Sequence, residues 1–263
     1  MCAIWDGNNW SAPRRITDDS VPDWGASVSY TDSGQAVLSW VSDLDGDYRD
    51  GSQTHPTTAV RSAVFDGTSW DLSTLAQDGE RFSGWTGGAR NGDGDVEIFW
   101  TRAGDGGYDL TMSAYNGAQF QTLEHVLSGE QYIGDPEVSG SSDGRVIVSY
   151  LGSNGKEQDV YAISHASPWA EAVDVTDDSL DYHSPVAVIG DEGKMVVGAG
   201  FEDFNETGET SSSAYDGSTT EDGLFSIDAS AFTPVVTIEN PISEVNGGEK
   251  SSIEWNDADL DSD

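Results

Sequence analysis

The sequence predicts an all-β protein, a β-propeller made of four-stranded antiparallel blades. Two turn patterns that recur along the chain support this prediction, together with the near absence of helical periodicity. The 263 residues are enough for one large all-β domain or two ordinary ones. The repeats favour five blades, the fifth of them shared between the two ends of the chain.

The first pattern is an aromatic residue followed by Asp-Gly or Asn-Gly. Between β-forming residues these pairs indicate a hairpin, because a type I′ turn needs positive φ at both central residues. Each copy therefore predicts the turn between the third and fourth strands of a repeat. The copies are Trp5-Asp6-Gly7, Phe65-Asp66-Gly67, Tyr115-Asn116-Gly117, Tyr215-Asp216-Gly217 and, in degenerate form, Ser167-Pro168-Trp169.

The second pattern is a glycine directly before an apolar strand, at Gly34, Gly94, Gly144 and Gly193. It predicts the turn between the first and second strands of each repeat. Four short strands about every 50 residues is the spacing of a propeller blade. A β-sandwich is the alternative architecture, but it does not account for an internal period.

The repeats fill residues 1–232, and residues 233–263 are expected to close the ring. The chain begins with a hairpin at residues 3–16 that lacks the first half of its blade. Residues 233–238 are similar to the first strand at 184–189, and residues 249–255 are similar to a second strand. A shared fifth blade would remove two open sheet edges. Alternatively, residues 233–263 begin a truncated immunoglobulin-like domain, and the chain is part of a larger exoprotein.

The charge excludes several classes of function. With 11 Lys and Arg against 48 Asp and Glu, the net charge is −37, and a nucleic-acid-binding module needs the opposite balance. No apolar run is long enough to insert into a membrane. Because 36% of the residues are hydrophobic, disorder is not expected. A folded chain with this charge predicts a high-salt environment, where salt screens the repulsion, and the composition resembles that of halophile proteins.

The aromatic-Asp-Gly hairpins resemble repeats of prokaryotic surface β-propellers, in the broad sialidase-like and kelch-like group. The resemblance covers about residues 1–230. It implies an extracellular or cell-surface location and leaves the activity open. The hairpins depart from the sialidase Asp-box, in which one residue separates Asp from Gly, and no cluster of three arginines is evident. Sialidase activity is therefore not expected.

The residues at the start of each repeat are the candidate ligand site. Irregular connections gather at one end of a propeller, where departures from the repeat favour binding. The repeat aligns Trp24 with Trp85, Asp135 and Ser184. Stacking tryptophans beside hydrogen-bonding groups predict a non-catalytic domain for binding or adhesion, with a glycan or a surface protein as partner; alternatively, the tryptophans plug the channel. The candidate ligand-binding residues are Trp24, Trp85, Asp135, Tyr132, Tyr182 and His183.

Two other functions stay open from the sequence. A polysaccharide-active glycoside hydrolase needs two carboxylates flanking the scissile bond, and Asp23 and Asp135 are the acids at suitable positions. In a chain with 48 acids, however, two at a chosen position carry little weight. The third possibility is a purely structural segment of a larger exoprotein.

Calcium is the one cofactor that the sequence suggests. Acids at alternating positions of a loop resemble calcium-binding loops, although both candidate stretches depart from the known patterns. The opposing interpretation is a solvated acidic loop. The candidate ligands are Asp43, Asp45, Asp47 and Asp50 in one stretch, and Asn91, Asp93, Asp95 and Glu97 in the other.

Overall fold

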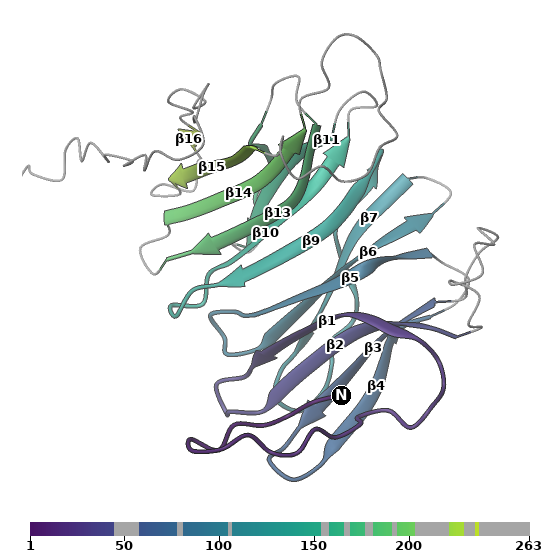
Figure 1. Ribbon diagram of the computed structural model, residues 1–263. Helices are drawn as coiled ribbons and strands as arrows, with labels where there is room; N and C mark the ends of the chain where they lie inside the picture. Colours follow the sequence, from purple (N-terminus) through teal and green to yellow (C-terminus); the bar gives the residue numbers. More distant parts are fainter. Residues whose placement is uncertain are drawn as a thin grey trace, which may run out of the picture.

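The computed structural model describes residues 1–44, 58–77, 81–104, 107–153, 158–165, 169–176, 181–190, 194–202, 221–228 and 235–236. Four four-stranded antiparallel sheets follow one another along this part of the chain (Figure 1). The all-β prediction is therefore confirmed. No described helix is long and apolar enough to cross a membrane.

Each sheet contains four strands that are consecutive in sequence, and each strand pairs with the next. We call these sheets the first to fourth blades. The first blade consists of β1 (Asp23–Tyr30), β2 (Ala36–Asp43), β3 (Thr58–Phe65) and β4 (Trp70–Ala76), and the second of β5 (Arg81–Arg90), β6 (Val96–Gly104), β7 (Gly107–Tyr115) and β8 (Glu124–Glu130). The third consists of β9 (Ile133–Gly140), β10 (Val146–Ser153), β11 (Gln158–His165) and β12 (Val173–Asp174), and the fourth of β13 (Asp181–Ile189), β14 (Lys194–Glu202), β15 (Glu221–Asp228) and β16 (Val235–Val236).

The blades are arranged with their first strands together. β1 lies against β5, β5 against β9 and β9 against β13 (Figure 1). This is the arrangement of a propeller, in which first strands surround the axis and fourth strands lie outermost. The propeller prediction is confirmed.

The two ends of the chain differ in their relation to the four blades. Residues 2–14 form a hairpin outside the four blades, with bridges between Cys2 and Arg14 and between Trp5 and Trp10. Val235 and Val236 pair with β15 in the fourth blade, and residues 237–263 lie outside the described residues. The shared fifth blade and its immunoglobulin-like alternative both stay predictions.

The aromatic-Asp-Gly pattern forms the predicted turns in the first two blades. The backbone N–H groups of Thr68 and Ser69 donate to Asp66 Oδ1 at 2.7 and 2.8 Å. These donors hold the pKa of Asp66 below its usual value. Gly67 has a φ of 97°, which glycine adopts without strain, but its neighbours Asp66 and Thr68 do not have positive φ, so the turn is not the predicted type I′. In the fourth blade, Tyr215-Asp216-Gly217 is expected between the third and fourth strands. The third strand, β15, begins only at Glu221, so this copy of the pattern does not lie between those strands. An Asp-Gly pair indicates a turn but does not say which turn of the blade it forms.

The hydrophobic core lies between neighbouring blades. Along β6, Ile98 and Trp100 pack against valines of the first blade, whereas Phe99 packs against the third blade. A strand that is buried on both faces is mostly apolar in sequence, as residues 146–148 also show. Trp100 and Tyr150 stand at the same position of successive repeats, and both are buried in the cores between blades, at 0% and 4% exposed.

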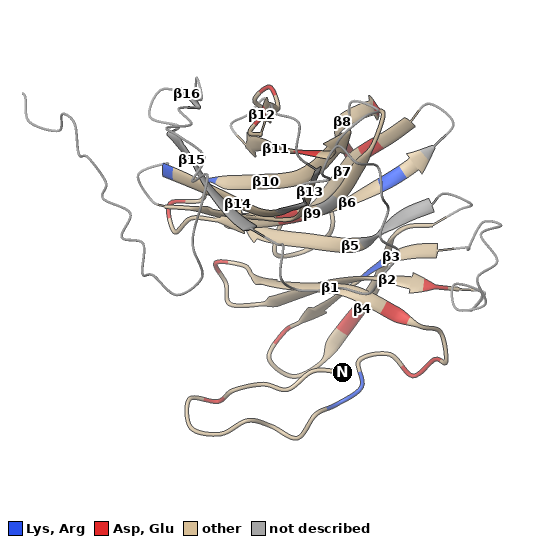
Figure 2. Cartoon of the chain, turned by 45° about the horizontal axis from the view of Figure 1, so that its top comes forward, with Lys and Arg blue, Asp and Glu red and all other residues tan. Residues whose placement is uncertain are grey.

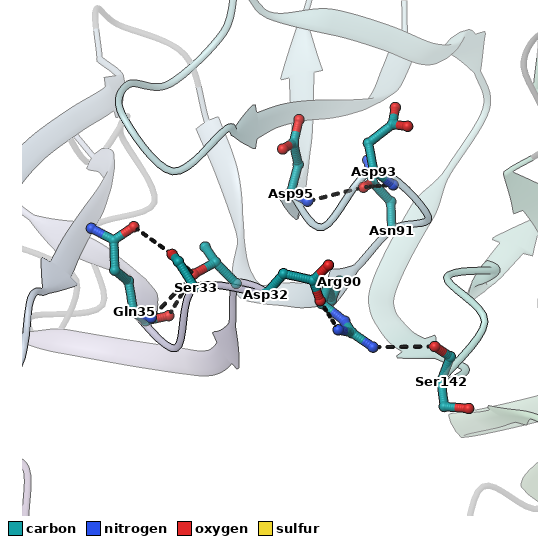
Figure 3. Close-up of polar contacts among 9 residues, drawn as sticks. Asp32, Ser33, Gln35, Arg90, Asn91, Asp93, Asp95 and Ser142 are labelled. Atoms are coloured by element: carbon teal, nitrogen blue, oxygen red, sulfur yellow. Dashed lines mark hydrogen bonds and ion pairs between the residues drawn. The ribbon is translucent and has the colours of Figure 1, made fainter.

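The turns between first and second strands pack on one another at one end of the propeller (Figure 3). The backbone N–H of Asp32 donates to the carbonyl of Gly94 at 3.2 Å. Arg90 forms an ion pair with Asp32 and donates to the carbonyl of Ser142 at 3.2 Å, so it joins turns of three successive blades. The turns are in close contact, because a Cβ added to Gly144 would lie 2.1 Å from the Cα of Gly92. A residue larger than glycine would therefore clash at this position.

Candidate functional site

The first strand of every described blade has a bulge at the same place. The register shifts between Trp24 and Ser27 in β1, between Phe82 and Thr86 in β5, and between His183 and Val186 in β13. In β9 the shift lies opposite Ser149–Leu151 of β10. A bulge leaves residues unpaired and turns their side chains away from the regular alternation, and bulges are frequent next to functional sites.

The bulged positions correspond between blades when they are counted back from the pair that closes each turn. These closing pairs are Tyr30–Ala36, Arg90–Val96, Gly140–Val146 and Ile189–Met195. The equivalent residues are Gly25, Trp85, Asp135 and Ser184, which we call the bulge ring. The predicted alignment of Trp85, Asp135 and Ser184 agrees with this register, but Trp24 lies one residue before the ring.

Two members of the bulge ring have features expected of a binding surface. The side chain of Trp85 is 54% exposed although it is large and apolar. Ser184 has a φ of 50° and is the one non-glycine residue with positive φ among those described. Gly25 also has a positive φ, of 61°. In a residue other than glycine, such as Ser184, this conformation costs free energy, and residues of this kind gather at functional sites.

Three of the predicted aromatic contacts serve packing in the structure. Trp24 is half-buried and packs against the core between the first and second blades. Tyr182 is 3% exposed and belongs to the core between the third and fourth blades. Tyr132 lies edge-on to Tyr108, with ring centroids 5.2 Å apart. Trp85 is thus the predicted aromatic residue that keeps a largely exposed ring.

His183 lies directly beside the bulge ring. A Cβ added to Gly200 on the neighbouring strand would come within 2.3 Å of its Cε1 atom, so glycine at that position makes room for the imidazole. The Nδ1 atom of His183 is 3.4 Å from Ser184 Oγ. The half-buried imidazole therefore lies beside the bulge ring, and its predicted role in ligand binding stays a prediction.

Asp23 is tied to the scaffold. Its Oδ1 atom accepts hydrogen bonds from Trp40 Nε1 at 3.0 Å and from Ser42 Oγ at 2.6 Å. Its Oδ2 atom accepts one from Thr17 Oγ1 at 3.3 Å. The side chain of Asp135 lies outside the described part, so the two-carboxylate hypothesis stays a prediction.

The residues of the second calcium stretch stabilise their own turn (Figure 3). Asn91 Oδ1 accepts the backbone N–H groups of Asp93 and Asp95 at 3.0 and 3.1 Å. Its Nδ2 atom donates to Glu97 Oε1 at 2.8 Å. Burial, with the charges of Asp93 and Glu97 nearby, raises the pKa of Asp95.

In the other stretch, Asp43 is buried at the end of β2, whereas Asp45, Asp47 and Asp50 lie outside the described residues. The residues that are described contain no group of three or more His, Cys, Asp and Glu side chains placed to hold a metal ion. Calcium at either stretch stays a prediction.

A buried ion pair between blades was missed by the sequence reasoning. Glu97 is 1% exposed, and its Oε1 atom lies 2.8 Å from Nδ1 of His165 in the third blade. The hydrogen bond to Glu97 raises the pKa of His165, whose ring stacks on Trp169 at 4.3 Å. The sequence does hold one sign of this pair, because Glu97 interrupts the otherwise apolar run Val96–Trp100.

No family model matches the sequence, and no curated protein is significantly similar to it. Among solved structures, the Penicillium chrysogenum α-L-arabinanase complexed with arabinobiose has 12% identity and a TM-score of 0.51 over 78% of this chain and 62% of that one. A PL25 ulvan lyase, from a family of polysaccharide lyases, has 13% identity and a TM-score of 0.54 over 83% of this chain and 60% of that one. The chain thus spans about three fifths of each of these proteins. At these identities the likeness concerns the fold, and that fold is the β-propeller.

Proposed function

We propose that this chain is a non-catalytic β-propeller that binds a glycan at the bulge ring. The observation that carries the proposal is the bulge shared by all four described first strands, with the exposed ring of Trp85 at one of its positions. An aromatic face stacks on the apolar face of a sugar, and neighbouring polar groups fix its hydroxyl groups. Ser184 and His183 supply such groups across the ring.

The ligand in this proposal is a neutral oligosaccharide. The likeness in fold to the arabinanase and the ulvan lyase supports a saccharide as the class of ligand. Concentrated salt screens the long-range repulsion from the net charge of −37, but Asp135 in the bulge ring disfavours an acidic or sulfated sugar at direct contact. A surface protein is the alternative partner.

Trp85→Ala is expected to weaken binding of a neutral oligosaccharide roughly tenfold, because an aromatic contact contributes about 1–1.5 kcal/mol. Calorimetric titration of a panel of oligosaccharides measures this loss. Trp10→Ala is the matched control, since Trp10 is 68% exposed but lies on the N-terminal hairpin, and it should bind as the unmodified protein does. Equal affinity of the two variants would place the ligand elsewhere.

The same panel separates binding from turnover. A binding domain leaves each oligosaccharide intact after long incubation, whereas a glycoside hydrolase releases shorter products. Product release that is abolished by Asp135→Asn would replace this proposal with the hydrolase alternative.

The proposed setting is extracellular or at the cell surface, in concentrated salt. At 1 M salt the Debye length is about 3 Å, so repulsion among the 48 acids is screened. Dialysis into low salt is expected to abolish the near-UV circular dichroism signal of the packed aromatic residues, and restored salt should recover it. A signal that persists in low salt would contradict the high-salt setting.

A further inference from the structure

The first and fourth blades each have one sheet face without a neighbouring blade. On β1, Val28 is 57% exposed, whereas its equivalent on β9, Val138, packs so closely on the second blade that a Cβ at Gly87 would lie 2.3 Å from it. On β13, Val186 and Val188 are 58% and 59% exposed. Both uncovered faces are those that a further blade between the fourth and the first would cover.

The N-terminal hairpin has the structure of half a blade. Its Trp5 and Trp10 rings lie 5.6 Å apart, like those of Phe65 and Trp70 at 5.0 Å in the first blade. The backbone N–H groups of residues 8 and 9 donate to Asp6 Oδ1 at 2.8 and 2.7 Å, as at the equivalent turn of the first blade. The hairpin lies beyond the first blade, on the side away from the second (Figures 1 and 2).

The register of the described blades identifies residues that fit the missing half. In the first blade Phe65 pairs with Ala36 and Arg61 with Trp40, and the second blade repeats these offsets. In this comparison Trp5 corresponds to Phe65 and Trp255 to Trp40. The same offsets then place Trp255 opposite Met1, as Trp40 lies opposite Arg61. Residues 238–258 then span the same length as Asp23–Asp43 of the first blade.

The bulge provides an independent check on this register. Counted in the same way, the bulged position of the new first strand falls on Asn240-Pro241. The bulges of the third and fourth blades are Asp135-Pro136 and Ser184-Pro185, so a proline follows the bulge-ring residue in all three. Asparagine also tolerates the positive φ that Gly25 and Ser184 adopt.

This register differs from the one that the sequence alone suggested. The expected first strand at residues 233–238 overlaps Val235–Val236, which pair with β15 as the fourth strand of the fourth blade. The later Asn240-Pro241 avoids this conflict. One position fits less well, because Glu249 stands where the other blades have the glycine of the turn.

We propose that residues 238–258 supply the first and second strands of a fifth blade, and that the N-terminal hairpin supplies its third and fourth strands. This blade covers the exposed valines of the first and fourth blades and pairs two open sheet edges. It also brings Asn240 to the fifth position of the bulge ring. The inference is independent of the glycan proposal, because it concerns closure of the fold.

A disulfide tests the register directly. Cys2 is the one cysteine of the chain, and the register places Glu254 opposite it. Directly opposed residues of antiparallel strands lie within the Cα separation of a disulfide. After mild oxidation of the full chain in high salt, Glu254→Cys is expected to lose two hydrogens in its intact mass and remain monomeric. Ile253→Cys is the matched control: its side chain points to the other face, so it should keep free thiols.

Other results would overturn the proposal. A disulfide-linked dimer of Glu254→Cys would mean that a second copy supplies the strand. Free thiols in this variant, or an equal yield from Ile253→Cys, would reject the register.

Labelling of Cys2 in the unmodified chain gives a second measurement that needs no new cysteine. The equivalent residues Ser62 and Met112 are 0% and 5% exposed, so the Cys2 thiol should react slowly with a maleimide. A chain that ends at residue 236 should react at the rate of an exposed thiol. Equal rates in the two chains would contradict the fifth blade.

Discussion

Trp100→Ala is expected to lower the free energy of unfolding by about 3–5 kcal/mol, the usual cost of removing a large buried aromatic side chain. Trp100 is 0% exposed and packs against Val41 and Val60 of the first blade. Its removal takes away apolar contacts on the face where two blades meet and leaves a cavity there. The loss therefore affects the attachment of one blade to the next.

Urea titration in high salt, followed by circular dichroism, measures this effect. Trp85→Ala is the matched control, because it makes the same substitution on the same blade at a side chain that is 54% exposed. We expect the control to shift the midpoint little. Similar midpoints for the two variants would show that the core between blades does not carry the stability.

At a pH low enough for His165 to be protonated, His165→Ala is expected to cost about 3–5 kcal/mol of unfolding free energy, because it leaves a buried carboxylate without its cationic partner. Glu97 is 1% exposed, and its Oε1 atom would keep only the hydrogen bond from Asn91 Nδ2 at 2.8 Å. The Oε2 atom of Glu97 is already buried without a hydrogen-bond partner. Few hydrogen bonds would therefore remain to stabilise the Glu97 carboxylate after the loss of His165.

A double-mutant cycle identifies the cause of this loss. Glu97→Gln removes the charge, so His165→Ala in that background should cost much less than in the unmodified protein. An equal cost in both backgrounds would show that the loss comes from the stacking of His165 on Trp169 instead of from the ion pair.

The same pair predicts a dependence of stability on pH. The hydrogen bond to Glu97 raises the pKa of His165 in the folded protein, so the folded state binds its proton more tightly than the unfolded state does. The stabilisation is fully present below the unfolded pKa of about 6.5 and is lost as the pH rises through the folded pKa. Urea titrations between pH 6 and pH 9 should show this decline, and His165→Gln should remove this part of it.

Local patterns were sufficient to predict the blades. The side chain of Asp66 caps its turn through two backbone N–H groups, and Gly67 takes the positive φ that the turn needs, so both requirements are visible in two adjacent letters. The burial of Trp100 and Tyr150 follows from their recurrence at one position of the period. Such features depend on neighbours along the chain, which a sequence displays directly.

The site was predicted less well, because its register depends on pairing between strands. The repeat aligned Trp24 with Trp85, but the bulge shifts the count by one residue and places Gly25 at that position. The partnership of Glu97 with His165 joins two blades, and no local pattern connects these residues. The sequence could therefore name Glu97 as a candidate calcium ligand but could not reveal its contact with His165.

Under the proposed function, the bulge ring separates ligand recognition from the architecture of the blades. Trp85 and Asp135 lie outside the regular strand register, so the ladder places few demands on their side chains, whereas the positive φ of Gly25 and Ser184 restricts those positions. Substitutions of Trp85 or Asp135 could change the preferred ligand while the blades keep their form. A laboratory library restricted to residues 85 and 135 would therefore explore new specificities on an unchanged frame.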